Sequence, residues 1–182
     1  MNQLSSLHNH GIKYIRKVDV VNGSFNADYT ANQTMAQGTG QPMTGWTNSG
    51  GCFYAGYANN NSPIIFPDQF YGNFCMVQFV GTYPKNWTTS QNIYFPYATS
   101  YTLRFNASVR AGTGYVNTHQ ITASIVGVSG SVVTGLNSNY GWIPYSWVFT
   151  VPSAGTYTLK FNVVNTGANA DTAVGFSNIT IV

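Results

Sequence analysis

Apolar and polar residues alternate with a period of two over long stretches of this chain. In YTLRFNASVR, residues 101–110, apolar side chains alternate strictly with polar ones, and YTLKFNV, residues 157–163, repeats the pattern. Such alternation predicts strands with one buried face and one solvated face. Further strands are expected at residues 74–80, 91–95, 120–128, 131–135, 145–151 and 173–182.

Turn-rich pieces such as GVSGS and VPSAGT separate these segments, and no ten-residue window has the spacing of an amphipathic helix. Eight or more short strands with such turns predict an all-β fold, an antiparallel two-sheet jelly-roll β-sandwich. We expect this sandwich to span residues 18–182, behind an N-terminal arm of residues 1–17. Between residues 27 and 73 the alternation is lost, which predicts long loops.

Composition supports one β domain and limits its partners. The chain has 182 residues, of which 43% are hydrophobic and only 6% charged. Asn, Ser, Thr and Gly disfavour helices, whereas Thr and Tyr suit strands. The net charge of +3 reflects few acids rather than many bases, so a nucleic-acid partner is not expected. No apolar run approaches the roughly 20 residues of a membrane span, and the first residues lack a secretory signal.

Three of the seven Lys and Arg residues lie in the arm, as Lys13, Arg16 and Lys17. Clustered positive charge suits contact with an acidic neighbour or a nucleic acid. Three charges are fewer than a usual basic tail carries, so we expect a solvated terminus, with such contacts as the alternative.

The alternation of side chains along a predicted strand separates rings expected in the core from rings expected at the surface. Tyr145, Trp147 and Phe149 share one side of a predicted strand, so we assign them to the core, where each ring contributes roughly 1.5–3 kcal/mol. The same argument assigns to the core Tyr101, Phe105, Tyr157 and Phe161.

Other rings lie in pieces without alternation, flanked by Asn, Gln and Thr. Such rings suit the apolar face of a sugar or a protein partner, although local packing is a third possibility. The candidate contact residues are Trp87, Trp142, Tyr140 and Tyr83, with Tyr54 and Tyr57 as a second, weaker group.

Several short motifs are informative because of the order in which they occur along the chain. They are NGSFN at 22–26, GW at 45–46, MVQFVG at 76–81, YTLRFNASVR at 101–110, WIPYSWVFTVPSAGTYTLKF at 142–161 and GFSNITI at 175–181. In this order they resemble the galactose-binding-like jelly roll shared by carbohydrate-binding modules of bacterial glycanases. The resemblance covers residues 18–182. It implies a non-catalytic module that often recognises polysaccharide, and it implies that Trp46 of the GW motif packs against the core.

The resemblance also implies a structural calcium, held between the acidic residue after NGSF and an Asp of the last strand. Here those positions are Asn26 and Ser177, both neutral, and calcium prefers charged oxygen ligands. We therefore expect no cofactor and no metal, with Asp28 and Asp171 as the only substitutes at hand.

Catalytic chemistry is not expected. Glycoside hydrolases need a pair of carboxyl groups, and this chain has only four Asp, scattered over its length, and no Glu. His119 is the only histidine outside the arm, and we expect it to be an exposed imidazole. We expect Cys75 to be a buried free thiol, while a bridge to Cys52 would require an oxidising compartment.

Two functions remain open. The first is a structural or attachment component of a virus particle, such as a minor capsid or decoration protein, which contacts other subunits or copies of itself at a virion or extracellular surface. The alternative is a lectin-like module that binds a polysaccharide or cell-surface glycan.

Overall fold

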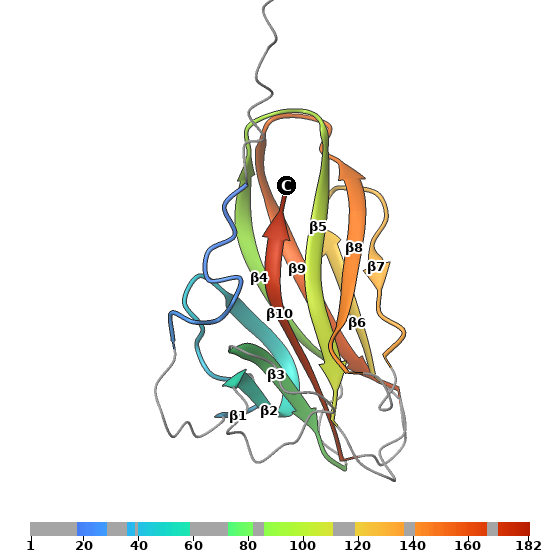
Figure 1. Cartoon of the computed structure of the whole chain (residues 1–182). Coiled ribbons are helices and arrows are strands. Elements are labelled where there is room, and N and C mark those ends of the chain that lie inside the picture. Colours follow the sequence, from blue (N-terminus) through green and yellow to red (C-terminus); the bar gives the residue numbers. More distant parts are fainter. Residues whose placement is uncertain are drawn as a thin grey trace, which may run out of the picture.

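Antiparallel strands form two layers in the computed structural model (Figure 1). The described residues are 18–28, 36–38, 40–58, 73–81, 86–110, 119–136, 141–166 and 171–182. Within these ranges there is no helix. The strands are β1 (Ala36–Gly38), β2 (Thr47–Ala58), β3 (Phe74–Phe79), β4 (Asn86–Phe95), β5 (Ser100–Val109), β6 (His119–Ile125), β7 (Val132–Val133), β8 (Ile143–Thr150), β9 (Gly155–Asn165) and β10 (Thr172–Ile181).

The strands are joined in the order β7-β6-β9-β4-β2-β3-β10-β5-β8, and β1 pairs with β2. Strand β2 belongs to both layers, because residues 47–51 pair with β4 and residues 54–58 pair with β3. We call the layer of β3, β10, β5 and β8 the β10 sheet, and the layer of β7, β6, β9 and β4 the β9 sheet. Strands distant in sequence, such as β3 and β10, are neighbours here, as in a jelly roll. The predicted all-β, two-sheet antiparallel sandwich is confirmed.

Aromatic rings fill the space between the sheets. Phe161 is fully buried, and its ring centroid lies 4.9 Å from that of Phe176, 5.1 Å from that of Phe105 and 6.0 Å from that of Trp46. Such tilted and offset ring pairs add about 0.5–1.5 kcal/mol each beyond their buried area. The predicted packing of Trp46 against the core rings is therefore confirmed.

The other rings assigned to the core from strand alternation also lie in the core or pack against it. Phe149 is buried, while Tyr145 and Trp147 are half-buried and pack against the core. Tyr101 and Phe105 are buried, and Tyr157 packs against the core cluster at its edge.

Strand β4 begins earlier than the sequence pattern predicts, at Asn86. Its inward-facing side chains include the polar Thr89 and Gln91, which interrupt the apolar half of the alternation. Trp87 precedes them on the same inward face and has 0% exposure. The prediction that Trp87 is a surface contact residue is therefore wrong, because it is a core ring.

Strand β2 runs through a region in which long loops were predicted. Three glycines within Thr47–Ala58 weaken its strand signal. Gly50 has a φ of +85°, and a Cβ there would lie 2.4 Å from the carbonyl oxygen of Asn86. Glycine is required at this position because the backbone has a positive φ and passes too close to the Asn86 carbonyl for a side chain.

Val18 pairs with the end of β10, since its backbone N–H donates to the carbonyl of Ile181 at 3.3 Å. The predicted arm, with Lys13, Arg16 and Lys17, lies outside the described residues. Its contacts therefore stay predictions. The structure contains, in the ranges given above, no helix with the length and hydropathy to span a membrane.

Candidate functional site

The outer face of the β10 sheet carries large side chains where a solvated strand would be polar. In β3, Cys75, Val77 and Phe79 point into the core cluster, so Phe74, Met76 and Gln78 point to the opposite face. Phe74 and Met76 are nevertheless only 1% exposed. This face therefore has an apolar layer of its own, outside the main core.

Strand β10 contributes only small side chains to the middle of this face. Ala173 pairs with Gln78, and Gly175 pairs with Met76 on one side and with Ser108 of β5 on the other. Small residues leave room above the sheet for a bulky group that reaches across from a neighbouring strand.

Trp142 is that group. It directly precedes β8, yet its ring centroid lies 5.0 Å from that of Phe74 in β3, with an interplanar angle of 62°. In the sheet, β10 and β5 separate β3 from β8, so this contact joins segments that are not neighbours in the strand order. Trp142 is half-buried and its Nε1 is buried, so only the remaining part of the ring reaches the surface.

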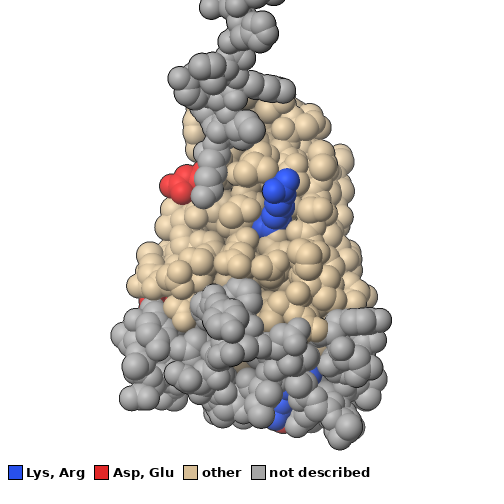
Figure 2. Space-filling view, viewed as in Figure 1, with Lys and Arg blue, Asp and Glu red and all other residues tan. Residues whose placement is uncertain are grey.

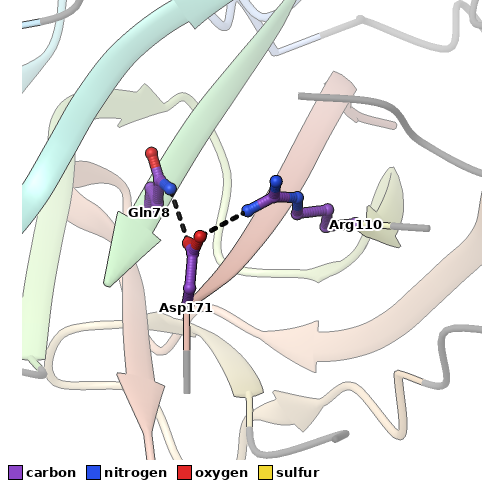
Figure 3. A network of polar contacts seen from close by, with 3 residues as sticks. All are labelled: Gln78, Arg110 and Asp171. Carbon is purple, nitrogen blue, oxygen red and sulfur yellow. Dashed lines mark hydrogen bonds and ion pairs between the residues drawn. The ribbon is translucent and has the colours of Figure 1, made fainter. Parts of the chain in front are cut away.

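A polar network lies on the same face (Figure 3). Asp171 Oδ1 accepts a hydrogen bond of 2.6 Å from Gln78 Nε2, and Asp171 Oδ2 forms an ion pair of 2.9 Å with Arg110 Nη1. Arg110 also donates its backbone N–H to the carbonyl of Ala173 at 2.9 Å. The network therefore ties together β3, the end of β5 and the start of β10.

Exposure differs between the two charged groups of this network. The side chain of Arg110 is 21% exposed and that of Asp171 is 44% exposed. An ion pair this accessible contributes little to stability, about 0–1 kcal/mol. Its geometry matters more, because two donors fix the carboxylate of Asp171 in one orientation while leaving much of it in contact with solvent.

The register shows where the backbone of Trp142 lies along the sheet relative to this network. Ile143 pairs with Ala107, so Trp142 lies at the level of Ser108, two residues from Arg110 along β5. Two residues along a strand span about 7 Å. The Trp142 ring itself contacts Phe74, which is four residues from Gln78 along β3, a length of roughly 13 Å. The indole and the carboxylate–guanidinium pair therefore lie on the same face of the β10 sheet but at separate points along it.

Charge is scarce around this site. The cationic side chains in the described ranges are Arg104, Arg110 and Lys160, and Figure 2 shows a described surface that is almost entirely uncharged. A ligand here would be recognised by hydrogen bonds and ring stacking rather than by net charge.

The remaining predicted contact residues are not placed by the structure. Tyr83 and Tyr140 lie outside the described residues, and the side chains of Tyr54 and Tyr57 in β2 are outside them as well. Their roles stay predictions. Gln78, Arg110 and Asp171 were not predicted as a site from the sequence. The single polar residue in the otherwise apolar segment FCMVQF, Gln78, was a sequence feature that indicated a polar contact on this strand.

The prediction of an exposed His119 is wrong. His119 is 4% exposed, and its ring stacks on Phe79 with centroids 5.7 Å apart. Burial lowers the pKa of this imidazole from 6.5 to about 4, so it is neutral at physiological pH. His119 is the first residue of β6, and the alternation of side chains along this strand directs the imidazole toward the core rather than toward solvent.

Both cysteines are buried and free, as expected for Cys75. Burial raises the pKa of Cys52 to about 12, and burial together with the nearby Cys52 raises that of Cys75. The Cys52 thiol donates to the carbonyl of Gly38 at 2.9 Å. Neither group is a reactive thiolate at neutral pH.

Over the ranges that the structure describes, no group of three or more His, Cys, Asp or Glu side chains could hold a metal ion. The carboxylates found there, Asp19, Asp28 and Asp171, come from three separate places in the fold.

Comparison with known proteins identifies the fold. The sequence matches no protein-family model and no curated protein. Among solved structures, the chain is similar to the carbohydrate-binding module TmCBM61 in complex with β-1,4-galactotriose. That similarity has a TM-score of 0.60 and 12% identity, over 90% of this chain and 96% of that chain.

A second similarity is to the enzymatically active domain of tailspike protein 4 of bacteriophage CBA120. It has a TM-score of 0.55 and 15% identity, over 89% of this chain and 21% of that chain. This chain thus spans about a fifth of the tailspike chain. At these identities the comparisons establish the fold, and the resemblance to the carbohydrate-binding-module jelly roll is confirmed at that level.

Proposed function

We propose that this chain is a non-catalytic carbohydrate-binding module whose ligand site is the outer face of the β10 sheet, at Trp142, Gln78, Arg110 and Asp171. The observation that carries the proposal is the occurrence of a half-buried indole and an oriented carboxylate–guanidinium pair on one face. The similarity to a module bound to β-1,4-galactotriose favours glycan binding over a purely structural role.

The chemistry of the site suits a sugar. The apolar face of a pyranose stacks on an aromatic ring, while its hydroxyl groups need fixed donors and acceptors. An ionised carboxylate has about four lone-pair positions. Gln78 and Arg110 each use one of them on Asp171, so acceptor positions remain for sugar hydroxyls. A side chain already held in one orientation loses little entropy when it binds.

The proposal is tested by titrating β-1,4-galactan, xylan and a mixed-linkage glucan into the protein by calorimetry. For whichever glycan binds, Trp142→Ala is expected to weaken binding at least about tenfold, or about 1.4 kcal/mol. Asp171→Asn is expected to weaken it as well, because it removes the charge that orients Arg110. The matched control is Tyr94→Ala, since Tyr94 is 63% exposed but belongs to the outer face of the β9 sheet.

Unchanged affinity in Trp142→Ala, with the fold retained by circular dichroism, would remove the site from consideration. Release of reducing ends from the bound glycan would contradict the non-catalytic part of the proposal.

A second candidate is a component of a virus particle that acts through contacts with other subunits. The likeness to a bacteriophage tailspike domain favours it. The two functions are compatible in an attachment protein at a virion surface. Light scattering of the purified chain tests the structural part: assembly that persists in Trp142→Ala supports subunit contacts away from the glycan site, and a monomer at all concentrations opposes them.

A further inference from the structure

The loop NGSFN is hydrogen-bonded to β10, a strand that is distant from it in sequence. The backbone N–H of Ile179 in β10 donates to the carbonyl of Gly23 at 3.0 Å. A Cβ on Gly23 would lie 2.3 Å from the carbonyl oxygen of Ile179, so only glycine permits this approach. The loop is thus pressed against the last strand of the sandwich.

Three neutral side chains complete this junction, and we call them the polar bridge: Asn26, Asn73 and Ser177. Asn73 Nδ2 donates to Asn26 Oδ1 at 3.1 Å, and Ser177 Oγ donates to the backbone carbonyl of Asn73 at 2.6 Å. Ser177 is fully buried and Asn73 is 8% exposed. The polar bridge therefore joins the loop, the residue before β3, and β10.

Two members of the polar bridge occupy the positions at which the resemblance implies calcium ligands. Calcium is held by six to eight oxygens, several of them from carboxylates. Here no carboxylate is present at either position, and the Asn73 amide directs an N–H toward Asn26 Oδ1, the oxygen that would have to face the ion.

The two acids that could substitute as ligands, Asp28 and Asp171, have other partners. Asp28 accepts hydrogen bonds of 2.8 Å from Asn22 Nδ2 and from the backbone N–H of Thr44. Asp171 is held by Gln78 and Arg110. The residues present do not fit a calcium ion at this junction.

We infer that the hydrogen bonds of Asn26, Asn73 and Ser177 replace a structural calcium, so that the stability of this chain does not depend on that ion. Buried hydrogen-bonded groups can fill such a role because each of them is satisfied by a protein partner. The inference concerns stability only and stands independently of the proposed glycan site.

Calorimetric melting of the chain in excess EDTA and in 5 mM calcium chloride, at about equal ionic strength, tests the inference. The melting temperature is expected to agree within about 1 °C, because a ligand that does not bind the folded state cannot raise it. A rise of several degrees in calcium would overturn the inference.

Two variants test the role of the polar bridge itself. Ser177→Ala and Asn26→Ala each remove one hydrogen bond, and each is expected to lower the melting temperature by about 2–4 °C in EDTA and in calcium alike. Ser146→Ala, at an exposed position of β8, is the matched control and should melt like the parent. Because Asn26 is exposed, its variant should fold even if Ser177→Ala does not. Parental melting of Asn26→Ala would overturn the assignment.

Discussion

The buried imidazole of His119 makes a quantitative prediction about pH. Its ring stacks on Phe79 and is 4% exposed, and in the described structure no group hydrogen-bonds its Nε2. Protonation in the folded state would place a charge in this apolar setting. Burial accordingly lowers the pKa from 6.5 to about 4.

The direction and size of the pH effect on stability follow from the difference in proton binding between the folded and unfolded chains. Above pH 6.5 the imidazole is neutral in both folded and unfolded chains, and its full stability contribution is present. As the pH falls from 6.5 to about 4, only the unfolded chain takes up the proton, so the free energy of unfolding decreases. The difference of 2.5 pKa units, 6.5 minus 4, corresponds to about 3 kcal/mol at 1.36 kcal/mol per unit.

Urea unfolding at several pH values between 7.5 and 4 measures this loss. At a slope of about 2 kcal/mol per molar urea, the midpoint of the parent should fall by about 1.5 M. His119→Leu removes the titrating group, so its pH profile should be flatter than that of the parent by this amount, and the comparison cancels contributions from other groups. Parallel profiles for the two proteins would refute the buried neutral imidazole.

Two further substitutions test the packing between the sheets. Phe161→Ala should lower the free energy of unfolding by about 3–5 kcal/mol, because it empties the centre of the ring cluster. The control Tyr94→Ala should change the free energy of unfolding by less than about 0.5 kcal/mol. If urea titrations show similar losses of stability in the two variants, the assignment of Phe161 to the core is wrong. Gln91→Ala should cost about 3 kcal/mol, since the Gln91 amide bonds the backbone N–H and carbonyl of Val21 and the carbonyl of Gly45, each at 2.8 Å. Gln120→Ala, at an exposed position, is its control, and equal stabilities would show that Gln91 does not fasten these segments.

The fold was predictable where each strand buries one uninterrupted apolar row. Strand β5 has such a row, and from Ser100 to Ala107 its burial follows the sequence alternation, which ends at the buried Ser108. Strand β4 does not, because Thr89 and Gln91 occupy inward positions, and the loss of the pattern caused Trp87 to be placed at the surface. The inward amide of Gln91 is satisfied by backbone groups distant in sequence, which no local pattern reveals.

The candidate site was predictable only in part. Trp142 was selected as a ring without strand alternation, and it is half-buried against Phe74 on the outer face of the β10 sheet. The polar network on the same face joins residues that are far apart in sequence, since Gln78 and Asp171 have a sequence separation of 93. Their proximity depends on β10 pairing with both β3 and β5, and that pairing is a property of the assembled sheet.

The most direct test of the account is a nuclear magnetic resonance titration of the isotope-labelled chain with the glycan that binds it best. The account predicts that the indole N–H of Trp142 and the side-chain resonances of Arg110 and Gln78 shift together and saturably, while Tyr94 on the opposite sheet does not respond. Saturable shifts confined to the outer face of the β9 sheet, with Trp142 unaffected, would contradict it.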